Sequence, residues 1–383
     1  MRPTDQIVTH LQYLKDRYDV AFLSIGDENF GSNRKLTHEL VEALGEMGFL
    51  WRASGVRART VDLETLKYWK ANGCLAVFFG IESGSQQMLD VMEKNTTVQM
   101  NVDALKWTYE AGLFTVVQLV LGMPGETDET IKETTEFLTA VSHYASMHQG
   151  LPGSSQSVNY AQALPGTPLY EYARENGYIG KNIDDEEQYL LRISDTDAYQ
   201  SDHFTNYTQQ PLLKVLIWPH RMGGEVNASY LEHVHRFRCS FPELIWDLLL
   251  SILRLVFGTE RLDRISADSP LHRRLSDVLS GRADKDKTGS LNLRRSLALT
   301  LFLNPTVRKH AYPLLALAIA IRNGASPVHS LGLISEHLVW SVKSRLRSKP
   351  DLPKRSLRKT VTIKPADGAR PGSEMTIPLR KGR

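Results

Sequence analysis

Residues 75–94 read LAVFFGIESGSQQMLDVMEK, and this stretch decides the fold class. The apolar run at 75–81 is typical of a buried strand, and residues 85–94 carry the apolar spacing of a helix. Only the short polar segment 82–84 separates the two. A strand that leads directly into a helix is one unit of an α/β fold with parallel strands.

The same alternation extends in both directions through the first 180 residues. Strand-like runs lie at 20–25, 49–56, 75–81, 114–121 and 157–164. Helical patterns lie at 36–47, 63–72, 85–94, 98–111 and 128–142, and an amphipathic helix is expected before the first run. Gly48, Gly73 and Gly112 each follow a helix, where a left-handed glycine belongs. Right-handed crossovers lay such strands side by side, in a barrel or an open sheet.

Polar residues concentrate directly after these strand-like runs. Because ligands of parallel α/β folds bind beyond the carboxyl ends of the strands, these segments form the predicted binding face. They are GDEN at 26–29, RAR at 57–59, GIESGS at 80–85, GMPGET at 122–127 and PGTP at 165–168.

Composition narrows the class of protein. The chain has 383 residues, of which 42% are hydrophobic and 23% charged, as in a globular protein with a buried core. Residues 331–383 hold thirteen Lys and Arg against four Asp and Glu, whereas the remainder is slightly acidic. We therefore expect no nucleic-acid binding by the body, and we regard the basic tail as a candidate patch for anionic lipid or nucleic acid. With two cysteines, Cys74 and Cys239, the chain has no disulfide framework and no CxxC zinc site.

Three segments are predicted. An α/β domain occupies 1–180, a mostly helical domain 181–342, and a basic flexible tail 343–383. The acidic run at 184–187 is expected to start a solvated helix. The most apolar helical stretch, 244–257, has 14 residues, too few to cross a bilayer; it packs in the domain or rests on a membrane surface. The polar start of the chain shows no signal peptide, so a cytoplasmic location is expected.

Four passages in order resemble the radical S-adenosylmethionine superfamily, specifically its branch associated with cobalamin-binding domains. They are DENF at 27–30, FGIESGS at 79–85 with the helix that follows, VQLVLGMPGET at 117–127 and LPGTPLY at 164–170. The resemblance implies a partial (β/α) barrel of the TIM type, followed here by a mostly helical region. It also implies S-adenosylmethionine, a [4Fe-4S] cluster on a CxxxCxxC loop, and cobalamin as cofactors. The activity it implies is adenosyl-radical chemistry, such as methyl transfer or rearrangement, on an unknown small-molecule substrate.

The sequence departs from the family pattern at the cluster. The resemblance begins at the family's first helix, so we expect the barrel to lack its first strand, the cysteine loop and the cobalamin domain. Cys74 reads as a buried core thiol, and Cys239 stands alone, so neither replaces the loop. Two explanations stay open. In one, an upstream-encoded half supplies the cluster; in the other, the chain is a non-catalytic barrel that binds a nucleoside or a partner.

Two neighbouring residues, Glu82 and Ser83, head the cofactor-binding candidates. The resemblance gives them contacts to the ribose or the methionine moiety of the nucleoside. A carboxylate suits a pair of hydroxyl groups because it accepts two charge-assisted hydrogen bonds. The alternative is that Glu82 caps a helix that starts at 83–85.

The remaining cofactor-binding candidates are Asp27, Glu28, Gln118, Pro124 and Gly125. The two acids either orient the cofactor's ammonium group or form a turn without a ligand. Gln118 lies on one strand face with residues 116 and 120, and it either meets the cofactor or is a satisfied buried amide. Pro124 and Gly125 form a tight turn, either near an adenine ring or purely structural.

Other polar residues also have both a functional and a structural interpretation. Arg57 and Arg59 are expected on one strand face, where they pair with a carboxylate or phosphate or with the acids at 27–28. Lys94 matches a basic position in the family's fourth helix, but an exposed helix lysine is the commoner state. His233 and His235 point apart on a helix, so no metal site is predicted there.

Overall fold

The computed structural model describes residues 3–149, 156–180, 182–194 and 204–234, with scattered positions beyond them and a hairpin of β6 (Thr360–Ile363) and β7 (Met375–Pro378). A single sheet of five strands, all parallel, has the order β1-β2-β3-β4-β5. The strands are β1 (Phe22–Gly26), β2 (Leu50–Val56), β3 (Cys74–Glu82), β4 (Val117–Leu121) and β5 (Gln156–Tyr160). All five predicted strands are confirmed, with ends shifted by a few residues.

Helices connect the strands as the sequence predicted, and further helices precede β1 and follow β5. They are α1 (Thr4–Tyr18), α2 (Arg34–Glu46), α3 (Leu63–Ala71), α4 (Gln86–Val91), α5 (Val98–Glu110), α6 (Asp128–Gln149), α7 (Pro168–Glu175), α8 (Ile183–Ser194) and α9 (Leu212–Val234), with the 3₁₀ turn η1 at Ala58–Thr60. The glycines Gly48, Gly73 and Gly112 have φ of +72°, +89° and +70°, which confirms the predicted left-handed ends. The predicted acidic helix start at 184–187 is also confirmed, since α8 carries Asp184, Asp185 and Glu186 in its first turn.

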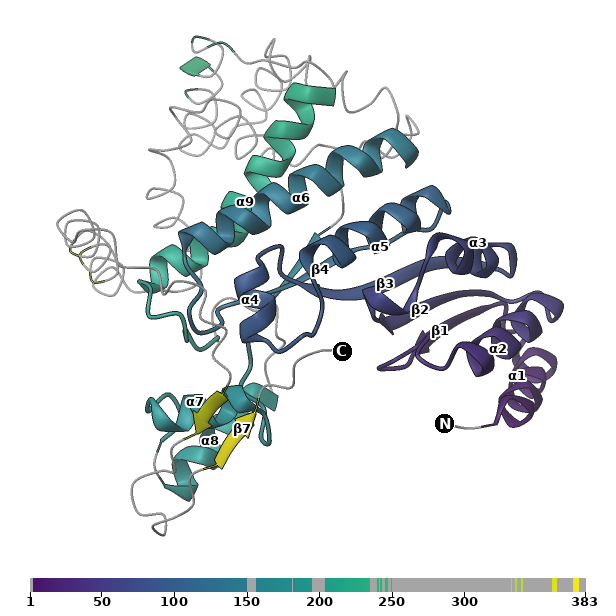
Figure 1. The fold of residues 1–383 in the computed structure, drawn as a ribbon, viewed down its shortest axis with the longest axis horizontal. Helices are drawn as coiled ribbons and strands as arrows, with labels where there is room; N and C mark the ends of the chain where they lie inside the picture. The colour runs from purple at the N-terminus through teal and green to yellow at the C-terminus, as the bar shows by residue number, and fades with distance from the viewer. Residues whose placement is uncertain are drawn as a thin grey trace, which may run out of the picture.

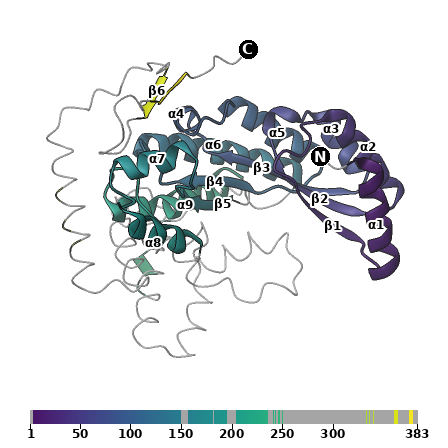
Figure 2. The same ribbon diagram turned by 90° about the horizontal axis from the view of Figure 1, so that it is seen from below.

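The connecting helices α2, α3, α5 and α6 lie along one face of the sheet (Figures 1 and 2). An open, doubly wound sheet reverses its strand order and carries helices on both faces. Here the spatial order follows the chain order without a reversal, which is the arrangement found in a (β/α) barrel. The structure is therefore an α/β fold with five parallel strands.

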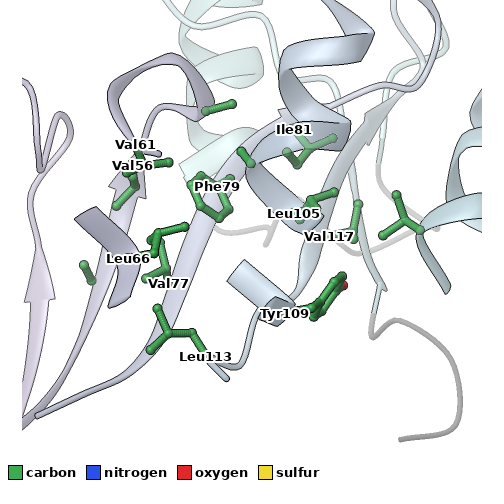
Figure 3. Close-up of a cluster of buried hydrophobic side chains, with 14 of the residues drawn as sticks. Val56, Val61, Leu66, Val77, Phe79, Ile81, Leu105, Tyr109, Leu113 and Val117 are labelled. Atoms are coloured by element: carbon green, nitrogen blue, oxygen red, sulfur yellow. The ribbon is translucent and has the colours of Figure 1, made fainter. Parts of the chain in front are cut away.

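The main core lies between the sheet and these helices. Figure 3 shows Phe79 and Ile81 of β3 pointing toward Leu66 of α3 and Leu105 of α5, and all four side chains are buried. Burial of one such side chain contributes roughly 1.5–3 kcal/mol relative to its exposure. This packing fixes which face of each strand is turned away from the helices, and that face carries the polar residues.

Helix α9 packs against α6 and shares the same core, although it comes from beyond residue 180. Its residues Val215, Trp218, Met222 and Val226 are buried in the cluster that also holds the strands. The proposed division of the chain at residues 180 and 342 stays a prediction.

Among the described residues, no helix is both long and apolar enough to cross a membrane. The apolar stretch at 244–257 and the basic tail at 343–383 lie almost entirely outside the described residues. The surface-association hypothesis for these segments therefore stays a prediction.

Candidate functional site

The site is built on the face of the sheet opposite the connecting helices, which we call the inner face. Strand side chains alternate, so every second residue points to it. Its residues are Phe22, Ser24 and Gly26 of β1, Leu50, Arg52 and Ser54 of β2, Phe78, Gly80 and Glu82 of β3, and Gln118 and Val120 of β4. Gln118 is half-buried on this face together with Val120, as the alternation predicted. In the sheet it is the direct neighbour of Gly80.

Glu82 ends β3 in a left-handed conformation, with φ of +62°. Such a backbone costs a residue with a Cβ roughly 1–2 kcal/mol, so its surroundings must hold it there. The Glu82 carboxylate pairs with Lys94 Nζ at 2.5 Å, while 16% of its side chain remains exposed. The alternative helix-capping role is wrong, because α4 begins after Ser85 and its first turn has no side-chain cap.

The pairing with Lys94 depends on an early end to α4. The helix stops at Val91, three residues before the predicted end, because Glu93 adopts a left-handed φ of +54°. The Lys94 N–H then donates to the Leu89 carbonyl at 3.1 Å, the pattern of a Schellman ending. The expected exposed helix lysine is therefore an ion-pair partner of the strand-end carboxylate.

Ser83 is 2% exposed and has protein partners. Its hydroxyl lies 3.1 Å from Thr134 Oγ1 on α6 and accepts the Ser85 N–H at 3.1 Å. Thr134 Oγ1 also accepts the Gly84 N–H at 3.2 Å. These bonds fix the loop after β3 onto α6 and so support the position of the neighbouring Glu82. A contact of Ser83 with the cofactor stays a prediction.

The turn after β4 is held by a buried carboxyl group. Pro124 and Gly125 occupy the middle of a turn closed by the Glu126 N–H, which donates to the Met123 carbonyl at 3.2 Å. Gly125 has φ of +81°, which suits a type II turn and confirms the predicted tight turn. Glu126 is 1% exposed and accepts the Gly122 N–H at 2.6 Å. Burial raises the pKa of Glu126 to about 8, although the N–H groups of Gly122 and Met123 oppose that rise.

The turn after β1 carries the two predicted acids. Asp27 and Glu28 are both exposed, and Asp27 Oδ1 accepts the Asn29 N–H at 2.7 Å. The turn packs closely on β2, since a Cβ at Gly55 would lie 2.0 Å from the Asp27 carbonyl oxygen. Glycine at 55, with φ of +70°, is what lets β2 reach this turn. A role of the two acids in cofactor binding stays a prediction.

The expected position of Arg57 and Arg59 on a strand face is wrong. Strand β2 ends at Val56, and the chain turns into η1, where the Thr60 N–H donates to the Arg57 carbonyl at 2.9 Å. A 3₁₀ turn does not place residues i and i+2 on one side as a strand does. Within residues 3–149 neither arginine forms an ion pair with Asp27 or Glu28, so the alternative pairing is also wrong.

Side chains of helix α9 contact Asp128 at the start of α6, next to the turn after β4. Asp128 Oδ2 lies 2.6 Å from Lys214 Nζ, and its Oδ1 accepts the Trp218 indole N–H at 3.0 Å. Arg221 Nη1 lies 3.6 Å from the same carboxylate. Burial lowers the pKa of Lys214, and the nearby Asp128 charge opposes that shift. In addition, Phe204 stacks on Tyr160 at 4.1 Å between ring centres and lies beside Gly122.

Among the described residues, the one cysteine is Cys74, and it lies away from this site. Cys74 starts β3, at the end of the strand opposite Glu82, and it is fully buried. Burial raises the pKa of its thiol to about 12, so it is a core thiol as predicted. The described residues contain no group of three or more His, Cys, Asp or Glu side chains that would hold a metal ion. His235 and the side chain of His233 lie outside the description.

Arg52 is an inner-face residue that the sequence reasoning missed. It stands within the apolar run at 49–56, and a charged residue inside such a run is the same signal that singled out Gln118. Glu126 and the partners of Asp128 were also missed. The partner of Glu126 is the nearby Gly122, but the burial of Glu126 depends on tertiary packing. The partners of Asp128 come from α9, about 90 residues away, and no local pattern encodes them.

Residues 1–138 match the family model of the Radical SAM superfamily, over the same strands and turns that build the site.

The curated relatives align with this chain over only part of their own length. An uncharacterized methyltransferase of Pyrococcus horikoshii is 29% identical over 182 residues, which are 46% of this chain and 36% of the relative. The anaerobic magnesium-protoporphyrin IX monomethyl ester cyclase of Cereibacter sphaeroides is 32% identical over 139 residues, which are 35% of this chain and 23% of the relative. The chain thus spans about a third or less of these proteins.

Solved structures resemble the chain at lower identity. The radical S-adenosylmethionine methyltransferase TsrM from Kitasatospora setae, with cobalamin and a [4Fe-4S] cluster bound, is 18% identical with a TM-score of 0.40 and covers 48% of this chain and 35% of its own. The cobalamin-dependent S-adenosylmethionine radical enzyme OxsB, with aqua-cobalamin and S-adenosylmethionine bound, is 15% identical with a TM-score of 0.43 and covers 88% of this chain and 54% of its own.

Proposed function

We propose that this chain supplies the S-adenosylmethionine-binding and substrate-binding part of a radical SAM enzyme of the cobalamin-associated branch. The reaction would be adenosyl-radical chemistry such as methyl transfer or rearrangement. Support comes from the superfamily match over residues 1–138 and from relatives that are a methyltransferase and a cyclase. The cobalamin association rests on the sequence resemblance alone.

One observation carries the proposal: the left-handed Glu82 at the carboxyl end of β3, paired with Lys94 and still partly exposed. A residue kept in a strained conformation at the binding edge of a parallel sheet is typical of a functional site. Its carboxylate can accept hydrogen bonds from the two ribose hydroxyl groups, and the Lys94 ammonium can meet the carboxylate of the methionine moiety.

Two neighbouring groups would complete the nucleoside site. Gln118 offers an amide on the inner face beside Gly80, and a Cβ at Gly80 would lie 2.8 Å from Glu82 Oε1, so Gln118 stands next to the Glu82 carboxylate. Pro124 is half-buried and Gly125 is exposed in the turn that follows β4. Backbone groups of an exposed turn can bind the edge of an adenine ring. The buried Glu126 carboxyl group and the ion pair between Lys214 of α9 and Asp128 would hold this turn in place.

The residues of this chain do not fit a [4Fe-4S] cluster. Such a cluster needs several thiolates close together, whereas the sequence holds two cysteines and Cys74 is buried away from the site. Within the proposal, the cluster ligands therefore come from residues outside this sequence, on a partner or on an upstream-encoded half.

The proposal is tested by titration calorimetry of the whole chain with S-adenosylmethionine. We expect binding by the wild type and roughly tenfold or greater weakening in Glu82→Gln, because a charge-assisted hydrogen bond contributes about 1.5–3 kcal/mol. Glu64→Gln, which alters an exposed pair on α3, is the matched control and should bind as the wild type does. Failure of the wild type to bind, or equal binding by Glu82→Gln, would refute the proposal.

A second candidate is a non-catalytic module that binds a nucleoside or a partner, favoured by the mismatch between the cysteines and a cluster. Iron content after anaerobic incubation with iron and sulfide separates the two. The experiment is run with and without a co-expressed polypeptide that carries a CxxxCxxC loop. Cleavage of S-adenosylmethionine only in the mixture supports the enzyme, whereas binding without cleavage in the mixture supports the module.

A further inference from the structure

Arg52 lies in the middle of β2 on the inner face, below the nucleoside site. It is the one Lys or Arg within the five parallel strands. Its neighbours in the sheet are Ser24 of β1 and Ala76 of β3. A charged side chain in the centre of a parallel sheet is unusual, because such strands are mainly apolar.

Two contacts hold the side chain without using its outer donors. Arg52 Nε donates to Ser24 Oγ at 2.9 Å, and the guanidinium lies over the Phe78 ring at 5.4 Å from its centre. Phe78 in turn meets Phe114 edge to face, with ring centres 6.3 Å apart. In the part of the chain that the structure describes, Nη1 and Nη2 have no hydrogen bond and no ion pair. Arg52 is exposed, and four N–H donors of its planar guanidinium group are therefore available to a ligand.

The charge of Arg52 is not balanced on this face. Glu82 is the one acidic residue in the five strands, and its carboxylate is occupied by Lys94 at 2.5 Å. The layer beneath Arg52 is apolar, with Phe22 and Leu50 exposed by 48% and 47%. In the layer above, Gly26 has no atom within 4 Å of the place where a Cβ would stand. The free guanidinium N–H groups thus face open space, with the apolar side chains of Phe22 and Leu50 on the amino-terminal side.

This combination selects a class of ligand. A planar guanidinium group can bind an oxyanion through two parallel hydrogen bonds. The neighbouring rings of Phe78 and Phe114 can pack against an apolar part of the same ligand. A phosphate dianion would call for a second cation, and the five described strands offer none besides Arg52. A carboxylate needs only one.

We propose that Arg52 binds a carboxylate of the substrate, and that the substrate's apolar part rests on Phe78 and Phe114. The inference rests on the proposed function, since it assigns a substrate class to the same inner face. It places the substrate's charged end at Arg52, below the nucleoside, and its apolar part across β3 toward Phe114, which lies at the same level of the sheet as Arg52.

The test uses 1-naphthaleneacetate, its neutral isostere 1-naphthaleneacetamide, and 1-naphthyl phosphate as probes of the whole chain, with affinities from NMR titration. We expect the wild type to bind the acetate at least about tenfold more tightly than the amide. Arg52→Met should remove that difference, and Arg52→Lys should keep part of it. Arg17→Met, which removes an exposed arginine of α1, is the control and should behave as the wild type.

Three results would overturn the inference: equal affinity of the wild type for acetate and amide, unchanged acetate binding in Arg52→Met, or tighter binding of the phosphate than of the acetate. The wild-type comparison decides even if Arg52→Met fails to fold. S-adenosylmethionine titration of the same samples keeps the two proposals apart. Loss of nucleoside binding with retained acetate discrimination would refute the proposed function and leave the Arg52 site standing.

Discussion

Glu126 makes the stability of the sheet domain depend on pH in an unusual direction. Its side chain is 1% exposed, and burial raises its pKa from 4.5 to about 8 in the folded chain. Between these two values the unfolded chain has lost the proton while the folded chain keeps it. The contribution of protonated Glu126 to the free energy of unfolding is therefore fully present below pH 4.5 and is lost as the pH rises toward 8.

The size of this effect follows from the shift. At about 1.36 kcal/mol per pKa unit, the loss between pH 5 and pH 8 comes to roughly 3–4 kcal/mol. Glu126→Gln cannot ionise and still offers a carbonyl oxygen to the Gly122 N–H, so its stability should change much less over this range. Near pH 8 the variant should match or exceed the wild type.

Guanidinium unfolding at pH 5, 6, 7 and 8 measures this difference, with the fluorescence of the buried Trp51, Trp69 and Trp218 as the signal. Glu136→Gln is the control, because Glu136 is 67% exposed and pairs only with Lys132 on the same helix. Its pH profile should follow that of the wild type. Parallel profiles for the wild type and Glu126→Gln, or a wild type that gains stability toward pH 8, would refute the reasoning.

Three further predictions concern the frame of the site. Asp128→Asn should cost roughly 2–3 kcal/mol of unfolding free energy in a denaturant melt, more than Lys214→Met, because it removes the negative charge that faces the buried Lys214 ammonium, whereas Asp128 itself is 38% exposed; equal costs would contradict this. Gly55→Ala should destabilise the fold by more than about 3 kcal/mol, since its Cβ would lie 2.0 Å from the Asp27 carbonyl oxygen. Gly48→Ala has a similar φ but open space around its Cβ, so it should cost about 1 kcal/mol. Thermal melts compare the two variants, and equal losses would contradict the prediction. Cys74 should resist alkylation in the native chain and react after unfolding, because it is buried and the pKa of its thiol is raised to about 12. Peptide mapping that finds Cys74 labelled under native conditions would contradict this.

Much of the local structure of the site was predictable from the sequence. The turn at 123–126 was predicted from Pro124 and Gly125, whose φ preferences are properties of single residues. The inward position of Gln118 followed from strand alternation. The same alternation failed at Arg57 and Arg59, because the strand ended one residue earlier in a 3₁₀ turn.

The partners of the site residues were not predictable in this way. Glu82 was expected to cap a helix or to bind a ligand freely, yet it pairs with Lys94, because a left-handed Glu93 ends α4 early. Nothing in the residue types at 92–95 requires that ending. The Ser83 hydroxyl likewise depends on α6, some fifty residues away, for its partner Thr134.

The sequence by itself determined the order of strands and helices, the glycine ends and the tight turns, since these depend on the periodicity and backbone preferences of neighbouring residues. It also determined that two cysteines do not make a four-iron cluster. Only the tertiary structure decided that Asp128 meets Lys214 and that Arg52 stands over Phe78 with its outer donors open. The reason is physical: such pairs join segments far apart in the chain, and their energies depend on burial and geometry that exist only once the sheet and helices have packed.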